Sequence, residues 1–531
     1  MKKTIEITKE YLWIPVCREA AETKIEIFCE KDKIQEMMIS KDEEKIDYYA
    51  TLPVSLLKHK KIDIKGNVKK TWFDNIKQSD QKPEPEGIRP LLHYAPVSGW
   101  MNDPNGLIYK DGVYHMYHQH NPYGVKWNNM HWSHTTTKDF ISYTETEPVL
   151  FPDKNGPIFS GTAICDKGNL MGYGKDTILY FYTCAGDKSD WSKNKKFTQR
   201  LAYSTDNGRT LKKSDLFFMD HIAEENRDPK VFYHEESKAY IMLLYLKNDT
   251  FGIYRTIDLK NFIETDRIYE EGMWECPDLF MVTEPETKKK KWVFWSADGY
   301  YMIGEFDGHL FKSESKRLCT YAATREDVTK FEDMRRYSPY AAQTFSGLGD
   351  RILQLAWIVS QKEERNYRGQ FSIPIEIRLM NTKKGERLSL LPAVEINYLH
   401  KKQKSERFTF NKETPFIRKT EGAALDLFVQ IKKQKKGKID IICFRNSITV
   451  DFTEKKIKTV LQEADIVEEG NYISLRIFVD RDIIEIFAQK GLSYFIAENV
   501  SDDVNGYIVT QTQDAISGTI DYNECNPVMF Q

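Results

Sequence analysis

A loosely repeated strand pattern in the middle of the chain constrains its fold more strongly than any other feature. Each copy begins with a polar or small residue, continues with an apolar strand and a turn, and ends in an aromatic-rich strand. The copies start at Asp103, Ser160, Asp228, Glu275 and Tyr340. A spacing of roughly 50 to 70 residues accommodates four strands with long loops, as in the blades of a β-propeller. We therefore predict a five-bladed β-propeller over residues 88–395, whose inner strands point at one pocket.

The region before the repeat also predicts strands, so that the fold class extends to the N-terminal part. Lys24–Cys29 and Lys61–Gly66 alternate apolar and polar residues, as half-buried strands do. The polar, proline-containing segment Gln78–Gly87 then predicts a linker. We interpret residues 1–85 as an extra small N-terminal β domain that resembles a sandwich.

The region after the repeat predicts a second β unit. Leu475–Val479 and Ile483–Phe487 are apolar strands separated by a short acidic and basic turn, which is typical of a hairpin. We expect a C-terminal β-sandwich over residues 400–531. The fold class predicted for the whole chain is therefore all-β.

Composition and charge limit the classes of partner. The chain has 531 residues, of which 40% are hydrophobic and 13% aromatic, enough apolar material for several cores. A formal net charge of −2 indicates no polyanionic partner. The lysine runs Lys288–Lys291 and Lys432–Lys438 fall between apolar strands, which favours exposed hairpin turns over nucleic-acid patches. A homo-oligomer stays open.

The N-terminal residues and the cysteines indicate a compartment. Met1–Glu6 carries basic residues but no apolar stretch follows them, and no apolar segment is long enough to cross a bilayer. The eight cysteines are scattered, without a Cys-x-x-Cys pair, so buried free thiols are expected. We expect a cytoplasmic protein with no membrane partner.

Three carboxylates occupy matching places in the repeat. Asp103 lies in Trp100–Gly106 (WMNDPNG), ahead of an apolar run, and Asp228 and Glu275 each precede an apolar strand in the same way. Any one of them alone is most simply explained as a turn or strand-cap acid. Three acids on strands that share an axis can meet at one point. Glycoside hydrolases use a pair of carboxyl groups at a common site as their catalytic residues.

The neighbours of these acids suggest different protonation states. Retaining hydrolysis needs a nucleophile and an acid/base whose carboxyl groups lie about 5 to 5.5 Å apart. Donors such as Asn102 and nearby backbone amides should lower the pKa of Asp103. Glu275, between a tryptophan and a cysteine, is expected to be partly buried beside apolar groups and to hold a proton. Asp228, beside Arg227, should be firmly ionised and suited to bind sugar hydroxyls.

Histidines and tryptophans near the first copy of the repeat allow other interpretations. The histidines between His115 and His134 bring no cysteine and no helical His-x-x-x-His pair, which favours polar packing over a zinc site. Most tryptophans are expected in cores. Trp127 is the best candidate for a sugar platform, because Gly124 and Asn128 flank it.

An ordered series of motifs closely resembles glycoside hydrolase family 32, the β-fructofuranosidases that include invertases, inulinases and levanases. The resemblance covers roughly residues 88 to 500. The matching blocks are Arg89–Gly106, His118–Pro122, Phe159–Gly161, Arg227–Pro229, Glu275–Asp278, Tyr340–Phe345, Arg368–Gln370 and the C-terminal stretch Leu475–Phe487.

The resemblance implies roles for nine residues. Asp103 is the expected nucleophile, Glu275 the acid/base and Asp228 the transition-state stabiliser. Six further residues match positions that line the fructose-binding subsite: Asn102, Gln119, Trp127, Phe159, Ser160 and Arg227. The resemblance also implies a propeller followed by a sandwich, retention through a fructosyl-enzyme intermediate, and no metal or other cofactor.

The function expected from this resemblance is the release of terminal β-D-fructofuranosyl units from fructo-oligosaccharides, fructans of the levan or inulin type, or sucrose. Three alternatives remain. A sucrose-6-phosphate hydrolase would need a basic phosphate site, for which Arg335, Arg336 and Arg365 are candidates. A fructosyltransferase would use the same intermediate, and a catalytically inactive module would only bind fructan. Asp333–Pro339 departs from the family pattern, which leaves the leaving-group preference open, and the N-terminal extension resembles those of some bacterial levanase-like members.

Overall fold

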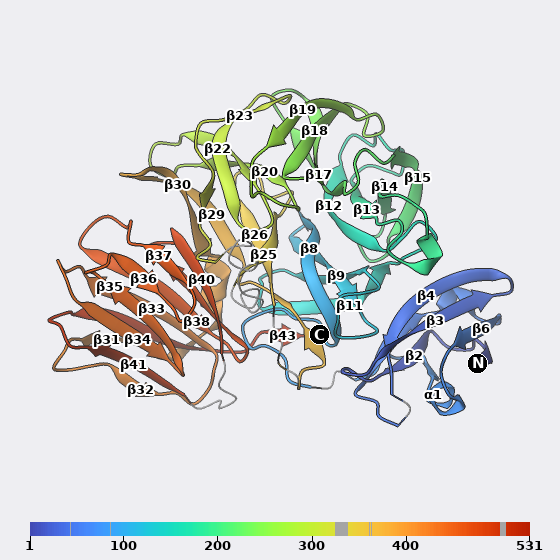
Figure 1. Ribbon diagram of the computed structural model, residues 1–531, viewed down its shortest axis with the longest axis horizontal. Helices are drawn as coiled ribbons and strands as arrows, with labels where there is room; N and C mark the ends of the chain where they lie inside the picture. Colours follow the sequence, from blue (N-terminus) through green and yellow to red (C-terminus); the bar gives the residue numbers. More distant parts are fainter. Residues whose placement is uncertain (43, 85–86, 324–337, 360–361, 363, 500–505) are drawn as a thin grey trace.

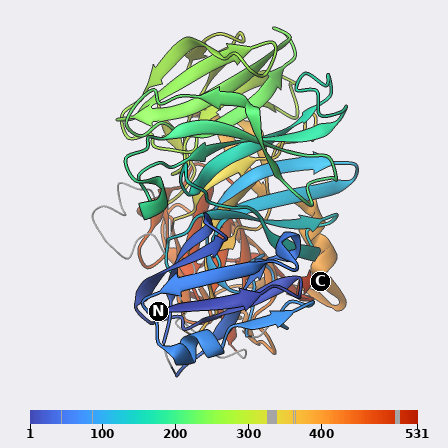
Figure 2. The ribbon, with the colours of Figure 1, turned by 90° about the vertical axis from the view of Figure 1, so that its right-hand side faces the viewer.

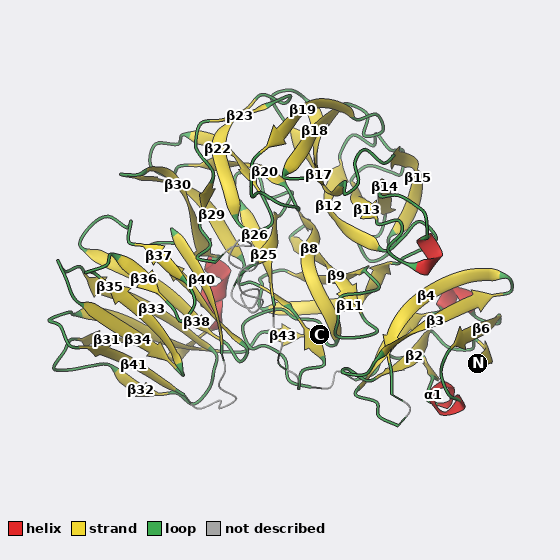
Figure 3. Ribbon diagram, viewed as in Figure 1, coloured by secondary structure: helices red, strands yellow, loops and turns green. Residues whose placement is uncertain are grey.

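The computed structural model describes residues 1–531 except 43, 85–86, 324–337, 360–361, 363 and 500–505 (Figure 1). Strands dominate the described residues (Figure 3), which confirms the all-β prediction. The helical segments are short: η1 (Ser55–Leu57), α1 (Lys70–Asp74), η2 (Asp190–Ser192) and η4 (Val394–Leu399). Among the described residues, no helix has the length and apolar character needed to cross a membrane.

Two sheets form the N-terminal module, a name used here for strands β1 to β7 with α1. One sheet has the order β1 (Lys2–Glu6), β6 (Lys61–Gly66), β3 (Glu22–Cys29), β4 (Asp32–Ser40), and the other β5 (Tyr48–Pro53), β2 (Tyr11–Val16), β7 (Lys77–Ser79). The two predicted strands are confirmed as β3 and β6, which pair with each other. The predicted linker starts too early, because Gln78 and Ser79 still pair with β2. In β3, alternate residues enter the core, as the sequence pattern predicts.

Five consecutive sheets follow in the described part of the central region, arranged around a common centre (Figure 1). Their innermost strands are β8 (Gly99–Lys110), β12 (Ile158–Asp166), β16 (Arg227–His234), β20 (Asp278–Thr283) and β25 (Tyr340–Thr344). The outer strands of the first three sheets are β9 (Val113–Asn121), β10 (His131–Thr137), β11 (Ser142–Leu150), β13 (Thr177–Cys184), β14 (Thr198–Ser204), β15 (Lys212–Met219), β17 (Ala239–Lys247), β18 (Thr250–Thr256) and β19 (Ile263–Tyr269). Those of the last two are β21 (Lys290–Trp295), β22 (Tyr300–Phe306), β23 (Phe311–Ser313), β24 (Leu318–Cys319), β26 (Leu353–Ile358), β28 (Gln370–Phe371), β29 (Ile375–Thr382) and β30 (Gly385–Pro392).

Side chains near the central axis connect one inner strand to the next. Thr162 on β12 donates a hydrogen bond to the carbonyl of Pro229 on β16 at 3.0 Å. The buried Lys230 ammonium lies 3.0 Å from the Asp278 carboxylate on β20 and also donates to Thr344 on β25. A buried charge needs such a partner, because leaving it unpaired away from water is costly. These contacts fix the inner strands relative to one another.

Two short strands from later in the chain complete the first sheet. β27 (Tyr367–Arg368) pairs in parallel with β8, and β43 (Met529–Phe530) pairs in parallel with β11. The first sheet therefore contains residues from three distant parts of the sequence.

The C-terminal region contains two six-stranded sheets, as a sandwich requires. The first consists of β31 (His400–Phe410), β42 (Gly518–Cys525), β33 (Leu425–Lys432), β38 (Tyr472–Val479), β39 (Ile483–Ala488) and β40 (Ser493–Glu498). The second consists of β32 (Ile417–Lys419), β41 (Tyr507–Thr512), β34 (Lys438–Cys443), β35 (Asn446–Asp451), β36 (Lys456–Lys458) and β37 (Glu463–Asp465). The predicted hairpin is confirmed as β38 and β39.

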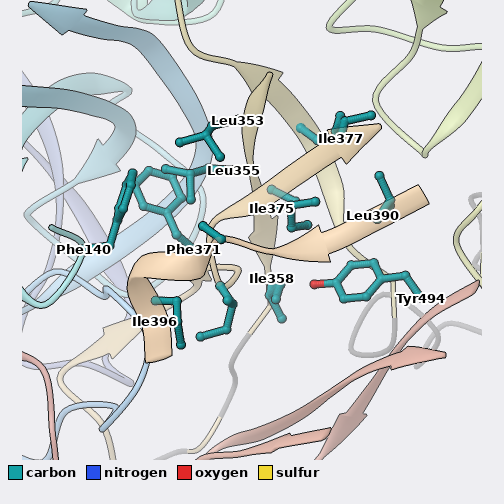
Figure 4. Packing of buried hydrophobic residues seen from close by; sticks show 14 of the residues in the cluster. Phe140, Leu353, Leu355, Ile358, Phe371, Ile375, Ile377, Leu390, Ile396 and Tyr494 are labelled. Atoms are coloured by element: carbon teal, nitrogen blue, oxygen red, sulfur yellow. The ribbon is translucent and has the colours of Figure 1, made fainter. Parts of the chain in front are cut away.

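One apolar core spans the last propeller sheet and the adjoining sandwich sheet. Figure 4 shows Leu353, Ile375 and Leu390 from the propeller in the same cluster as Tyr494 from β40. The turn after β38 also lies in this junction. Its Asp480 carboxylate accepts hydrogen bonds from two backbone N–H groups of the segment that precedes β8. Burial of this shared apolar surface joins the two units firmly.

The N-terminal module lies on the opposite side of the propeller from the sandwich (Figure 1), and in the turned view it faces the viewer, below the middle propeller sheets (Figure 2). The C-terminal strand β43 lies against the propeller, beside β11 (Figure 1).

Candidate active site

Four of the five innermost strands share a backbone irregularity at the end nearest the site, whereas β20 pairs regularly with β21. The pairing register shifts between Met101 and Pro104 on β8, and between Ile158 and Gly161 on β12. The same shift occurs after Arg227 on β16 and after Tyr340 on β25. A bulge of this kind re-aims side chains that a regular strand would send into the sheet. It brings residues from separate sheets to one place.

A cavity of about 440 Å³ lies at these bulges. All nine residues predicted from the sequence line it: Asn102, Asp103, Gln119, Trp127, Phe159, Ser160, Arg227, Asp228 and Glu275. Sequence reasoning assigned no site role to the other lining residues, Trp100, Met130, Trp274, Tyr340 and Trp357. Of these five, Tyr340 could have been predicted from the sequence as a site residue, because it starts the fifth copy of the repeat.

Backbone strain is concentrated at two of the three acids. Asp228 has φ 62°, Glu275 has φ 47° and Cys276 has φ 37°. Residues other than glycine rarely adopt this left-handed region, and such conformations cluster at functional sites, where the surrounding structure enforces them.

Side chains hold the Asp103 carboxylate from both sides. Ser160 Oγ donates to one oxygen at 2.6 Å and Asn102 Nδ2 donates to the other at 3.0 Å. The Trp100 indole N–H donates to Asn102 Oδ1 at 2.9 Å, which orients the amide. Burial raises the pKa of Asp103, and the charge of Glu275 adds to this, although the bonds from Ser160 and Asn102 oppose it. The Asn102 donor does lower this pKa, as predicted, but burial outweighs the donors, so the net shift is upward rather than downward.

Glu275 lies among polar donors. Its two oxygens accept hydrogen bonds from the Arg227 guanidinium and from the Tyr340 hydroxyl, each at 2.6 Å. Arg227 is fixed in turn by the carbonyl of Glu225 and by the ring of Tyr245, 4.6 Å from its guanidinium. Glu275 is partly buried, as predicted, but polar donors rather than apolar groups contact its two oxygens. Both oxygens are oriented, and about a quarter of the side chain stays exposed to solvent.

Asp228 is the most deeply buried of the three acids. Burial raises its pKa to about 7, with the charges of Glu275 and Asp103 acting in the same direction and that of Arg227 opposing them. The prediction of a firmly ionised Asp228 is wrong for the free protein, because the guanidinium does not compensate for the loss of water.

The Cys276 thiol lies between two of the carboxylates. Its sulfur is 3.6 Å from Asp103 Oδ2 and 3.5 Å from Asp228 Oδ2, and its backbone N–H donates to the latter oxygen at 3.2 Å. Burial and the surrounding carboxylates raise the pKa of the thiol well above its usual range. Cys276 therefore remains a neutral donor within the acid cluster.

Aromatic rings form the mouth of the cavity. Trp127 is 51% exposed and meets Phe159 edge to face, with ring centroids 5.9 Å apart. Trp100 and Trp357 make a similar contact at 5.6 Å. Ring faces with adjacent polar groups suit the apolar and hydroxyl faces of a sugar.

Arg365 and His120, candidates for a phosphate site and a metal site, do not line this cavity. Arg365 is buried and pairs with Asp482 at 2.8 Å, outside the cavity lining, and Arg335 and Arg336 lie outside the described residues. Asp333–Pro339 is described only at its last two positions. His120, a candidate in the metal interpretation, bonds to Ser133 and to the carbonyl of Ser98, which is the expected polar packing.

Known proteins of one glycoside hydrolase family match most of the chain. The family description "Glycosyl hydrolases family 32 N-terminal domain" matches residues 93–392, and the C-terminal description of that family matches residues 396–496. A levanase of Bacillus subtilis (strain 168) is 29% identical over 463 residues, which cover 76% of this chain and 65% of the levanase. An extracellular exo-inulinase of Meyerozyma guilliermondii is 34% identical over 306 residues, covering 51% of this chain and 54% of that protein. The chain thus spans between half and two thirds of these relatives.

Solved structures match the fold. An exo-inulinase from Aspergillus awamori superposes with a TM-score of 0.72 at 21% identity, covering 83% of this chain and 98% of that one. A glycoside hydrolase family 32 protein from Bifidobacterium adolescentis gives a TM-score of 0.67 at 17% identity and covers 99% of both chains, N-terminal module included. The predicted propeller and C-terminal sandwich are confirmed. With the family match covering more than half of the sequence, including all three acids, the chain belongs to glycosyl hydrolase family 32.

Proposed function

We propose that the protein is a retaining β-fructofuranosidase that releases terminal β-D-fructofuranosyl units from fructo-oligosaccharides, levan- or inulin-type fructans, or sucrose. The observation that carries the proposal is the convergence of Asp103, Asp228 and Glu275 in one aromatic-rimmed cavity. Relatives with the names levanase, invertase and exo-inulinase support the substrate class.

In the first step, ionised Asp103 attacks the anomeric carbon of the fructosyl unit while the bond to the leaving oxygen breaks. Glu275 gives its proton to that oxygen, so that the leaving sugar departs as an alcohol. Ser160 and Asn102 orient the attacking carboxylate, and Arg227 and Tyr340 orient the acid. The product of the step is a fructosyl ester on Asp103.

In the second step, Glu275 takes a proton from water, which attacks the same carbon and releases Asp103. Two displacements on one carbon return the original configuration. Asp228 accepts hydrogen bonds from fructosyl hydroxyls, an interaction that strengthens as charge develops on the sugar ring.

The test is a product-resolved time course with sucrose, a trisaccharide fructan, inulin, levan and sucrose-6-phosphate. We expect free fructose as the first product from unphosphorylated substrates. With methanol added, a retaining enzyme also forms methyl β-D-fructofuranoside. Absence of fructose from all substrates contradicts the proposal, and activity confined to the phosphorylated sugar replaces it with the phosphate-specific alternative.

The first variant to compare is Asp103→Asn. We expect kcat to fall by several orders of magnitude without loss of the fold, because an amide cannot form the covalent intermediate. Asp111→Asn is the matched control, since Asp111 lies exposed in the turn at the other end of the same strand. Near-normal turnover by Asp103→Asn would exclude this mechanism.

A further inference from the structure

A second cavity continues outward from the acid/base. It measures about 590 Å³ and shares Trp127, Phe159, Arg227 and Glu275 with the cavity of the three acids. The acid/base must touch the leaving oxygen, so the leaving group lies on the Glu275 side of the scissile bond. The second cavity is therefore the path of the leaving group, a conclusion that rests on the proposed function.

Three loops wall this second cavity, and the one between β15 and β16 contributes His221, Glu224 and Glu225. The other two contact the N-terminal module. The Trp127 loop, residues 122–130, connects β9 to β10. The Trp191 loop, residues 185–197, connects β13 to β14 and contributes Asp187, Lys188, Lys195, Lys196 and Phe197 to the lining. Charged heads beside aromatic rings can bind sugar hydroxyls and ring faces.

Strand β4 of the N-terminal module holds the Trp127 loop. The Asn129 side chain bonds to the backbone N–H and carbonyl of Met38, each at 2.7 Å, in the manner of a neighbouring strand. Asn128 donates to the Glu22 carboxylate on β3 at 2.9 Å. Val125 is buried in the core of the module. Lys126 and Trp127 are thus the exposed residues between anchored positions.

The same strand holds the Trp191 loop. The backbone N–H of Trp191 donates to Glu36 Oε1 at 3.0 Å, and the Lys33 ammonium lies 5.6 Å from the indole centre. Lys33 also pairs with Glu36 at 2.7 Å. Within the loop, Asp187 accepts a bond from Asn194 and its N–H donates to the carbonyl of Ser192, at 2.8 and 2.9 Å. Asp187 in the cavity lining is therefore bonded to Ser192, the residue next to Trp191 in the chain.

We propose that the N-terminal module is a working part of the leaving-group site. Through β4 it fixes both loops, and so it determines how well the enzyme accepts long leaving groups. Glu36 and Asn129 are positioning residues in this scheme, because they act on the substrate only through the loops they hold. The leaving groups concerned are oligosaccharides that extend beyond the sugar next to Glu275.

The test compares two substrates in Glu36→Ala. A pentasaccharide fructan reaches into the second cavity, whereas methyl β-D-fructofuranoside releases only methanol. We expect kcat/KM for the pentasaccharide to fall about fivefold, the effect of losing one hydrogen bond, mainly through KM. The value for the methyl glycoside should stay unchanged. Glu36→Gln keeps an oxygen acceptor for the Trp191 N–H. The ratio of kcat/KM for the pentasaccharide to kcat/KM for the methyl glycoside should therefore return most of the way to the wild-type value.

Further variants separate positioning from general damage. Lys9→Ala removes an exposed ion pair with Asp80 elsewhere in the module and should leave the ratio as in the wild type. Trp191→Ala keeps the backbone N–H that bonds to Glu36 but removes the indole beside Lys33, a second contact of β4 with the same loop. It decides the question if Glu36→Ala does not fold. The inference is overturned if the wild type is active and both Glu36→Ala and Trp191→Ala keep the wild-type ratio of the two kcat/KM values. Absence of fructose release by the wild type itself overturns the proposed function instead.

Discussion

At the scale of single residues, the three acids share one local environment, and Cys276 links two of them. Sequence neighbours correctly indicated Asn102 as a partner of Asp103. Arg227, expected to act on the adjacent Asp228, lies 3.8 Å from it and donates its hydrogen bond to Glu275. The protonation states could not be predicted in the same way, because they depend on how much water the complete fold excludes. Burial dominates the pKa of both Asp103 and Asp228, and no local pattern reports it.

The raised pKa values predict the acid limb of the pH profile. Asp103 must be ionised to attack, so kcat/KM should fall as pH decreases through a range above that of ordinary carboxylates. The Cys276 thiol lowers the pKa of Asp103 by hydrogen bonding, and Cys276→Ala should therefore move the limb to higher pH. Initial rates at low substrate concentration between pH 4 and 8 measure both effects. A limb that stays in place in the variant would exclude the thiol as a donor to Asp103.

At the scale of elements, the bulge that recurs in four of the five inner strands explains why most starts of the sequence repeat lie at the active site. The repeat starts were predictable, since polar residues at strand ends precede apolar runs. Which side chains the bulges turn inward was not predictable, because it depends on register within each sheet. Tyr340 is an example. The sequence identifies it as a repeat start, but its hydrogen bond to Glu275 depends on the bulge that follows it in the folded strand.

The bond from Tyr340 gives a prediction at this scale. Tyr340→Phe removes one donor to Glu275 and keeps the ring, so we expect kcat/KM to fall about tenfold, equivalent to roughly 1.4 kcal/mol. Thermal stability should change little. Tyr233→Phe on β16, where the ring is 41% exposed, is the control. Equal kinetics in the two variants would show that the hydroxyl contributes nothing to catalysis.

At the scale of the whole molecule, units distant in sequence depend on each other. The strand patterns predicted each unit from its own residues. The contacts of β4 with the Trp127 and Trp191 loops, and those of Asp480 with the segment before the propeller, join residues far apart in sequence. Periodicity within a segment carries no information about such partners.

A buried ion cluster at the propeller–sandwich junction makes stability depend on pH. Burial disfavours the charged form of His93, but the Asp480 and Glu485 carboxylates outweigh it and raise the pKa to about 9. Because this value exceeds that of an unfolded histidine, about 6.5, the stabilisation is complete below pH 6.5 and is lost as pH rises through 9. We expect the Tm to decrease over this range. In His93→Gln the Tm should be lower at pH 6 and change less between pH 6 and 9; parallel curves would contradict the assignment.

Pairing of β43 with β11 has a consequence for biosynthesis. The first propeller sheet emerges from the ribosome early, yet its outer strand β11 pairs with residues 529–531, which are translated hundreds of residues later. Until then the nascent chain presents an unpaired strand edge, the kind of surface that invites aggregation. The protein can thus complete its first blade only at a late stage of translation, so its yield in a cell should depend on chaperones that shield this edge in the meantime.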